Sequence, residues 1–131
     1  MGKATKSRHK AEDFDLLALR RILEKSGSHS LSVVSDSMEP LIKVGERITL
    51  APPQKEELKV FDVILFDQAN RLNCHFVTRI NHQKDSYTTR SLKFPHSQDY
   101  PIKWEQIIAF IPAKKLNWFH KLKVIWAEIR A

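Results

Sequence analysis

The sequence is poor in cysteine and glycine and contains no long apolar run. Cys74 is the single cysteine in 131 residues, which excludes an intrachain disulfide and a cysteine zinc site and gives no sign of an oxidising compartment. Three glycines do not make a phosphate-binding glycine loop, and no His, Asp or Glu cluster has the spacing of metal ligands. No window offers the roughly 20 consecutive apolar residues that a membrane-spanning helix needs. We therefore expect a cytoplasmic chain with no cofactor, no metal and no transmembrane helix.

Positive charge is in excess and is concentrated at the start of the chain. The formal net charge is +7, with 22 Lys and Arg against 15 Asp and Glu. Lys3, Lys6, Arg8 and Lys10 stand in the first ten residues without an acid, so residues 1–10 are predicted to be a disordered basic tail. Such a tail can attract nucleic acid or an anionic membrane face, but a solvated leader is the simpler interpretation and the one we favour.

The length and the balance of residue types fit one folded domain with tails. Apolar residues make up 42% and charged residues 28% of the chain, as in ordinary globular proteins. A helix is predicted over 11–25, because its acids come first, its bases come last and Gly27 can end it. Apolar residues also recur there at helical spacing. They are Leu16, Leu19, Ile22 and Leu23.

From Ser30 onward the sequence changes to short β-type runs separated by turn-forming residues. The runs are LSVVS, ERITL, KVFDVILF, NCHFVTRI, SYTTRSL and QIIAFIPA. Their close spacing leaves little room for crossover helices, so we predict a mainly β fold, small and coiled, with an antiparallel sheet. Residues 11–115 would form this β domain together with the N-terminal helix.

A second helix, amphipathic and basic, is predicted over 116–130 and makes 116–131 a separate C-terminal segment. The residues that share its apolar face are Trp118, Leu122, Ile125 and Ile129. Two roles stay open for it. The helix can pack on the sheet, which is the commoner role of such a stripe, or it can make a peripheral contact with a membrane interface.

The most informative segment is SDSMEPL, residues 35–41, which is followed by Gly45-Glu46 and a predicted strand. Ser37 leaves a β-type run and enters a turn that Pro40 helps to fix, so its hydroxyl can be exposed on a sharp bend. A serine in a turn is by itself weak evidence of chemistry, because most such serines only make local hydrogen bonds.

Four segments carry a resemblance to a known family. In order, SMEP, VGERITL, VFDVILF and CHFVTRI resemble the successive motifs of the signal peptidase I and LexA-type serine peptidases. The similarity runs from about Leu31 to Lys114. It implies the small coiled antiparallel β-fold of the signal peptidase/LexA type, here with a helix at each end.

The same resemblance implies the catalytic roles. The serine of the Ser-Met-x-Pro box is the family's nucleophile, which corresponds to Ser37, and its backbone N–H is an oxyanion donor. The base is Lys in bacterial members and His in the archaeal and endoplasmic-reticulum type, and the matching residue here is His75. A serine hydroxyl needs such a base, and an imidazole, with a reference pKa near 6.5, can accept a proton at neutral pH with little tuning. Ser35 matches a position that helps to form the oxyanion hole in bacterial signal peptidases.

Histidine-type members also carry a late acid that orients the base. Asp99 is the candidate here, although the family's preceding Gly-Asp pair is missing; as a third member it would fix the imidazole tautomer, and a turn-forming role is the alternative. Asp62 matches a family Asp and is expected to bond the backbone structurally. Met38 and Pro40 are expected to shape the bend and to line a substrate pocket. Three positions depart from the family, with Glu46 for Asp, Phe61 for Gly and Phe76 for Arg.

Three functions follow, in order of preference. The first is a serine endopeptidase that uses a Ser37/His75 dyad to cleave a signal or leader peptide, bound as an extended strand with small side chains beside the cut. The second is a catalytically inactive peptide-binding or regulatory module on the same fold, which the missing Gly-Asp pair favours slightly. A nucleic-acid-binding protein ranks last, because the single N-terminal helix offers no helix-turn-helix. The expected partner is thus a peptide or protein substrate.

Overall fold

The computed structural model describes residues 16–33, 35–69, 71–94, 99–117, 120–123 and 125–126. Within these ranges the chain is mainly β, as the sequence predicts, with two antiparallel sheets, two 3-10 helices and an α-helix over 16–26. The basic tail predicted over 1–10 and the first residues of the predicted N-terminal helix lie outside the described residues.

Each predicted β-type run overlaps one strand. At the third run the strand starts three residues later than predicted, at Asp62. At the first run the strand starts two residues earlier than predicted and ends at Ser32, so Val33 and Ser35 belong to the bend that carries Ser37. The strands are β1 (His29–Ser32), β2 (Arg47–Leu50), β3 (Asp62–Gln68), β4 (Arg71–Asn81), β5 (Ser86–Arg90) and β6 (Ile107–Lys115), and the 3-10 helices are η1 (Lys55–Glu57) and η2 (Trp104–Gln106).

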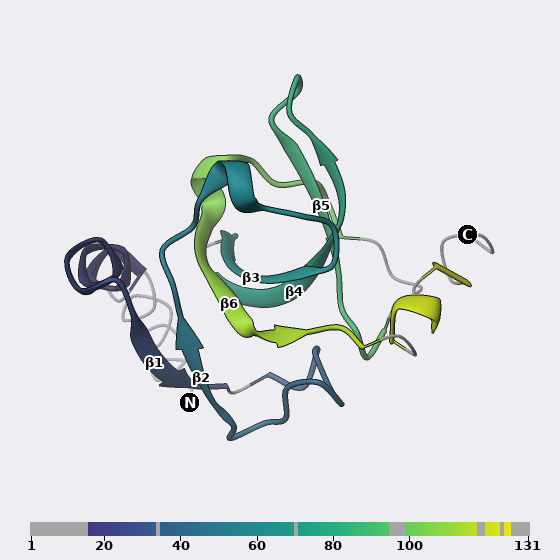
Figure 1. Ribbon diagram of the computed structural model, residues 1–131, viewed down its shortest axis with the longest axis horizontal. Helices are drawn as coiled ribbons and strands as arrows, with labels where there is room; N and C mark the ends of the chain where they lie inside the picture. Colours follow the sequence, from purple (N-terminus) through teal and green to yellow (C-terminus); the bar gives the residue numbers. More distant parts are fainter. Residues whose placement is uncertain are drawn as a thin grey trace.

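The smaller sheet meets the larger one where the chain after β2 reaches β6, and the larger sheet is strongly curved (Figure 1). The larger sheet has the order β5-β4-β3-β6, and β1 pairs with β2 in the smaller one. Ala51, directly after β2, exchanges backbone hydrogen bonds of 2.9 Å with Phe110 of β6. This bridge brings the β1-β2 ribbon alongside β6.

The core lies on both faces of β3, which explains its unbroken apolar run. Val63 and Leu65 belong to one cluster of buried side chains, together with Leu23 of the N-terminal helix. Ile64 and Phe66 belong to a second cluster. Successive side chains of a strand point to opposite faces, so a strand that is covered on both faces carries apolar residues at every position.

Two tight turns have a backbone conformation that favours glycine. Gly45 has φ +86°, and its N–H donates to the Val33 carbonyl over 2.7 Å. Phe61 has φ +79°, a value that L side chains rarely adopt. The adjacent Asp62 accepts a hydrogen bond of 2.9 Å from the Lys59 N–H, so it stabilises the turn into β3 in the structural manner expected of it.

The N-terminal helix is docked on the domain, whereas the described part of the C-terminal helix is exposed on its apolar face. Leu16 and Leu19 of the first helix are buried in the core. Residues 120–123 and 125–126 are helical, and Leu122 and Ile125 are 43% and 45% exposed. Trp118 and Ile129, also expected on this face, lie outside the described residues. None of the described helices is long and apolar enough to cross a bilayer.

Candidate active site

Ser37 lies on a bend whose next residue, Met38, is packed in the hydrophobic core. Met38 is only 1% exposed and belongs to the main core cluster, while its carbonyl accepts a hydrogen bond of 3.0 Å from the Ile42 N–H. Pro40 is exposed and follows a cis peptide bond. Both residues shape the bend as expected. Their role in lining a substrate pocket stays a prediction.

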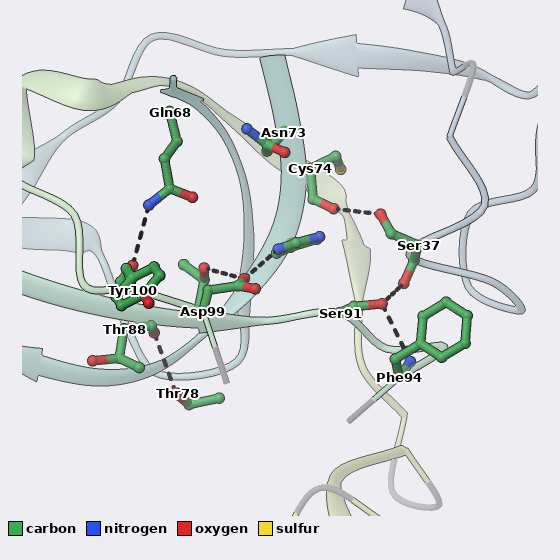
Figure 2. Close-up of polar contacts among 12 residues, drawn as sticks. Ser37, Gln68, Asn73, Cys74, Thr78, Thr88, Ser91, Phe94, Asp99 and Tyr100 are labelled. Carbon is green, nitrogen blue, oxygen red and sulfur yellow. Dashed lines mark hydrogen bonds and ion pairs between the residues drawn. The ribbon is translucent and has the colours of Figure 1, made fainter. Parts of the chain in front are cut away.

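The Ser37 hydroxyl is hydrogen-bonded to two neighbours. It donates to the Cys74 carbonyl over 3.2 Å (Figure 2), and it accepts a hydrogen bond of 3.2 Å from the Ser35 hydroxyl. The Ser37 N–H also donates to Ser35 Oγ, again over 3.2 Å. The two groups predicted to bind the oxyanion, the Ser37 N–H and the Ser35 hydroxyl, are therefore in contact with each other and with the candidate nucleophile.

His75 and Asp99 form a short polar contact in the site. His75 Nδ1 lies 2.5 Å from Asp99 Oδ2, and both side chains are largely buried, at 14% and 22% exposure. The same carboxylate oxygen accepts a hydrogen bond of 2.8 Å from the Thr89 hydroxyl. A carboxylate on Nδ1 leaves Nε2 as the ring nitrogen available to a reacting group.

Asp99 is held as a carboxylate. Burial acts to raise its pKa, but the hydrogen bonds from His75 and Thr89 and the charge of Arg90 outweigh burial, so its pKa is lowered. An ionised Asp99 can stabilise a positive charge that develops on the imidazole. This is the electrostatic role of the third member of a serine triad.

The remaining link of a triad is not closed in this conformation. Among the hydrogen bonds of the described residues, none joins the Ser37 hydroxyl to the His75 ring. The Cys74 carbonyl that Ser37 contacts belongs to the peptide bond leading into His75, so the hydroxyl lies beside the backbone that carries the imidazole. Catalytic hydrogen bonds are often long or misaligned without substrate. A working dyad would need the Ser37 hydroxyl to exchange its contact with the Cys74 carbonyl for one with the His75 ring.

The loop after β5 holds the bend that carries Ser37, and no sequence motif predicted this contact. The Ser37 carbonyl accepts hydrogen bonds from the Ser91 hydroxyl at 2.5 Å and the Lys93 N–H at 2.9 Å. Lys93 Nζ donates to Asp36 Oδ2 at 2.5 Å and lies 3.8 Å from Glu39 Oε1. The loop after β5 thus binds residues on both sides of the nucleophile.

These contacts do not favour Lys93 as a general base. Its hydrogen bond to Asp36 raises the pKa of its ammonium group, and the nearby Glu39 charge acts in the same direction. A lysine base needs the opposite shift, toward neutrality. His75 is therefore the better candidate for proton transfer.

An open groove runs beside the site between two strand edges. In the part of the chain that the structure describes, β1 pairs only with β2, and β4 has β5 as a partner only from Phe76 onward. A cavity of about 240 Å³ lies between these edges. Its walls include Leu31 and Val33 on one side, Leu72 and Cys74 on the other, and Ser35 at the end next to Ser37.

The sequence-predicted residues meet in two groups that share the Cys74-His75 peptide. Ser35 and Ser37 form one group, and His75 and Asp99 form the other. Thr89, Ser91 and Lys93 were missed. Their contribution depends on contacts between residues that are ten or more positions apart in the chain, which no local sequence pattern predicts. Within the described residues, no three His, Cys, Asp or Glu side chains are grouped as metal ligands. Comparisons with family models, curated proteins and solved structures found no match to this chain.

Proposed function

We propose that the protein is a serine endopeptidase of the signal peptidase or LexA type that cleaves a signal or leader peptide. The observation that carries the proposal is the 2.5 Å contact of His75 with Asp99, beside a peptide bond whose carbonyl binds the Ser37 hydroxyl. A nucleophile, a base and an acid that orients the base are the three parts that acyl transfer by serine needs.

In the proposed reaction, Ser37 Oγ attacks the scissile carbonyl and its proton passes to His75 Nε2. Asp99 stabilises the imidazolium through Nδ1. The Ser37 N–H and the Ser35 hydroxyl donate to the tetrahedral oxyanion, for which they must exchange their present mutual contact. The C–N bond then breaks, the imidazolium gives its proton to the leaving amine, and water hydrolyses the acyl ester by the same route.

The groove suits an extended peptide. Backbone groups of Val33 face β2, where Val33 N–H donates to Glu46 over 2.9 Å, so those of Ser32 face the opposite edge. Across the groove the Cys74 carbonyl points toward Ser37. An added strand can therefore hydrogen-bond on both sides, and the apolar cavity beside Ser35 favours small apolar side chains near the cut.

Backbone geometry gives the resemblance independent support. The family has glycine at the positions of Gly45 and Phe61, and these two residues have positive φ, +86° and +79°. A position that needs positive φ favours glycine for steric reasons. Phe61 thus occupies a glycine-type backbone site although it is not glycine.

The second candidate is an inactive peptide-binding module on the same fold. It is favoured by the Ser37 hydroxyl, which is bonded to Cys74 rather than to His75, and by the absence of the family's Gly-Asp pair from the stretch between Arg90 and Asp99. This alternative shares the groove but not the chemistry.

The test is hydrolysis of a set of leader-type peptides by the wild-type chain, Ser37→Ala and His75→Ala. Ser28→Ala and His82→Ala are matched controls, because both residues are exposed and lie away from the site. The proposal predicts cleavage by the wild type and the controls only. Equal cleavage by Ser37→Ala would refute the assignment, and peptide binding without cleavage would establish the inactive module.

A further inference from the structure

A second apolar cavity lies at the far end of the groove, under the N-terminal helix. Its volume is about 320 Å³. Leu19 and Ile22 of the helix form one wall, and His29 at the start of β1 forms part of the other. Ile22 is 38% exposed, so this wall is accessible to a ligand.

This cavity adjoins the groove beside Ser35. Leu31 and Leu72 line both the 320 Å³ cavity and the 240 Å³ cavity next to Ser35. The two cavities are therefore neighbours along β1 and β4, one next to Ser35 and the other at the helix. A peptide that lies in the groove as an added strand can extend into the helix cavity.

The distance between the two cavities determines which residue of a bound peptide lies in the cavity under the helix. Strands rise about 3.3 Å per residue, so the segment from His29 to Ser35, whose last three residues lie outside β1, spans at most roughly 20 Å. An extended peptide anchored at Ser37 therefore places in the helix cavity a side chain about four to six residues from the bond that is cleaved.

The walls determine what kind of side chain fits. Leu16, Leu19, Ile22, Leu31 and Leu72 are aliphatic, and His29 is the one ionisable side chain among the described residues that line the cavity. Such walls offer no partner for a charged side chain, whose desolvation would go uncompensated. A large aliphatic or aromatic side chain can fill the space.

We propose that this cavity is a specificity subsite that takes a large apolar side chain of the peptide substrate, about four to six residues from the scissile bond. The inference rests on the proposed function. It also goes beyond it, because the helix over 16–26 precedes the region that resembles the peptidase family. The helix thus adds to the groove a wall that selects among substrate side chains.

The test is peptide binding by the full-length Ser37→Ala chain, which holds substrate without cleaving it. Fluorescent peptides carry leucine or serine at each position from three to seven residues from the cleaved bond, and their affinities are measured by anisotropy. We expect leucine at one or two of the positions about four to six residues away to strengthen binding on the order of 10- to 100-fold, as apolar pockets discriminate.

Two helix variants locate the effect. Ile22→Glu, in the Ser37→Ala background, is expected to abolish the preference for leucine, and the milder Ile22→Ala to reduce it. Leu17→Glu is the matched control, because Leu17 is an exposed residue (61%) of the same helix that does not line the cavity. Circular dichroism verifies that each variant is folded.

The outcomes separate this inference from the proposed function. Affinities that do not depend on the side chain at any tested position, or that fall equally in Ile22→Glu and Leu17→Glu, overturn the subsite while hydrolysis by the wild type still supports the peptidase. Selective binding with no hydrolysis by the wild type overturns the peptidase and leaves the subsite as a peptide-binding feature. Absence of binding by every peptide overturns both.

Discussion

Replacing Asp99 with asparagine tests the electrostatic part of the proposed mechanism. One oxygen, Oδ2, receives both the His75 and the Thr89 contact. An asparagine whose amide oxygen takes the place of Oδ2 can keep both hydrogen bonds, so the substitution removes mainly the negative charge. The expected loss is therefore that of the interaction between a carboxylate and a developing imidazolium.

The magnitude follows from Coulomb's law. Charge centres about 4 Å apart, at an effective dielectric constant of about 20, interact by about 4 kcal/mol. Each 1.36 kcal/mol of transition-state energy is a factor of ten in rate, so kcat should fall on the order of 10³-fold. The low exposure of both side chains limits screening by solvent. Losses near 10⁴ are typical when the corresponding acid of a serine triad is replaced.

The assay is kcat and KM for peptide cleavage by wild type, Asp99→Asn, Thr89→Val and Glu56→Gln. Thr89→Val removes one hydrogen bond to Asp99 and should cost about 1 kcal/mol, or roughly fivefold. Glu56→Gln removes an exposed carboxylate of η1 and should be neutral. A fall in kcat of less than tenfold for Asp99→Asn, with KM unchanged, would show that Asp99 only forms a turn.

Three further predictions concern the loop, the pH dependence of stability and the backbone. Lys93→Met should lower kcat by up to about tenfold by loosening the serine bend, and the exchange of charges in Lys93→Asp with Asp36→Lys should restore part of it; if the exchange recovers nothing, the ion pair does not position the nucleophile. Because the pKa of Asp99 is lowered by His75 and Thr89 against the effect of burial, its contribution to the free energy of unfolding is complete above the ordinary aspartate pKa of 3.8 and is lost as pH falls through the lower pKa of the folded state. Urea unfolding from pH 7 to 3 should therefore show a smaller loss for Asp99→Asn than for wild type, and identical losses would contradict the assignment. Gly45→Ala should cost about 1 to 2 kcal/mol of unfolding free energy by denaturant titration, because φ is +86° while a Cβ would meet nothing within 4 Å; an unchanged midpoint would show that the turn relaxes.

The β-rich part of the fold was predictable because its signals are local. Period and composition located each of the strands in the described residues to within a few positions, and the unbroken VILF run of β3 reflects burial on both faces. The first strand was displaced because Val33, directly after Ser32, packs into the core from the bend. Val33, for example, is 8% exposed although it lies outside β1.

The candidate site was predictable only through the resemblance, and only in part. Ser37 and His75 match motif positions, but the link between His75 and Asp99 joins residues 24 apart, in a segment where the family's Gly-Asp pair is missing. The bonds from Ser91 and Lys93 to the Ser37 bend cross 54 or more residues of chain. Contacts of that range depend on how the sheet coils, which local propensity does not specify.

Nucleophilic catalysis by Ser37 is tested most directly by identification of an acyl-enzyme. The protein is mixed with an activated peptide ester, quenched with acid within a turnover and digested for mass spectrometry. The proposed acyl-enzyme mechanism predicts an acyl adduct on Ser37 that His75→Ala does not form and that Asp99→Asn forms far more slowly. An adduct on another residue, or no adduct on Ser37 while the ester is hydrolysed, would contradict it.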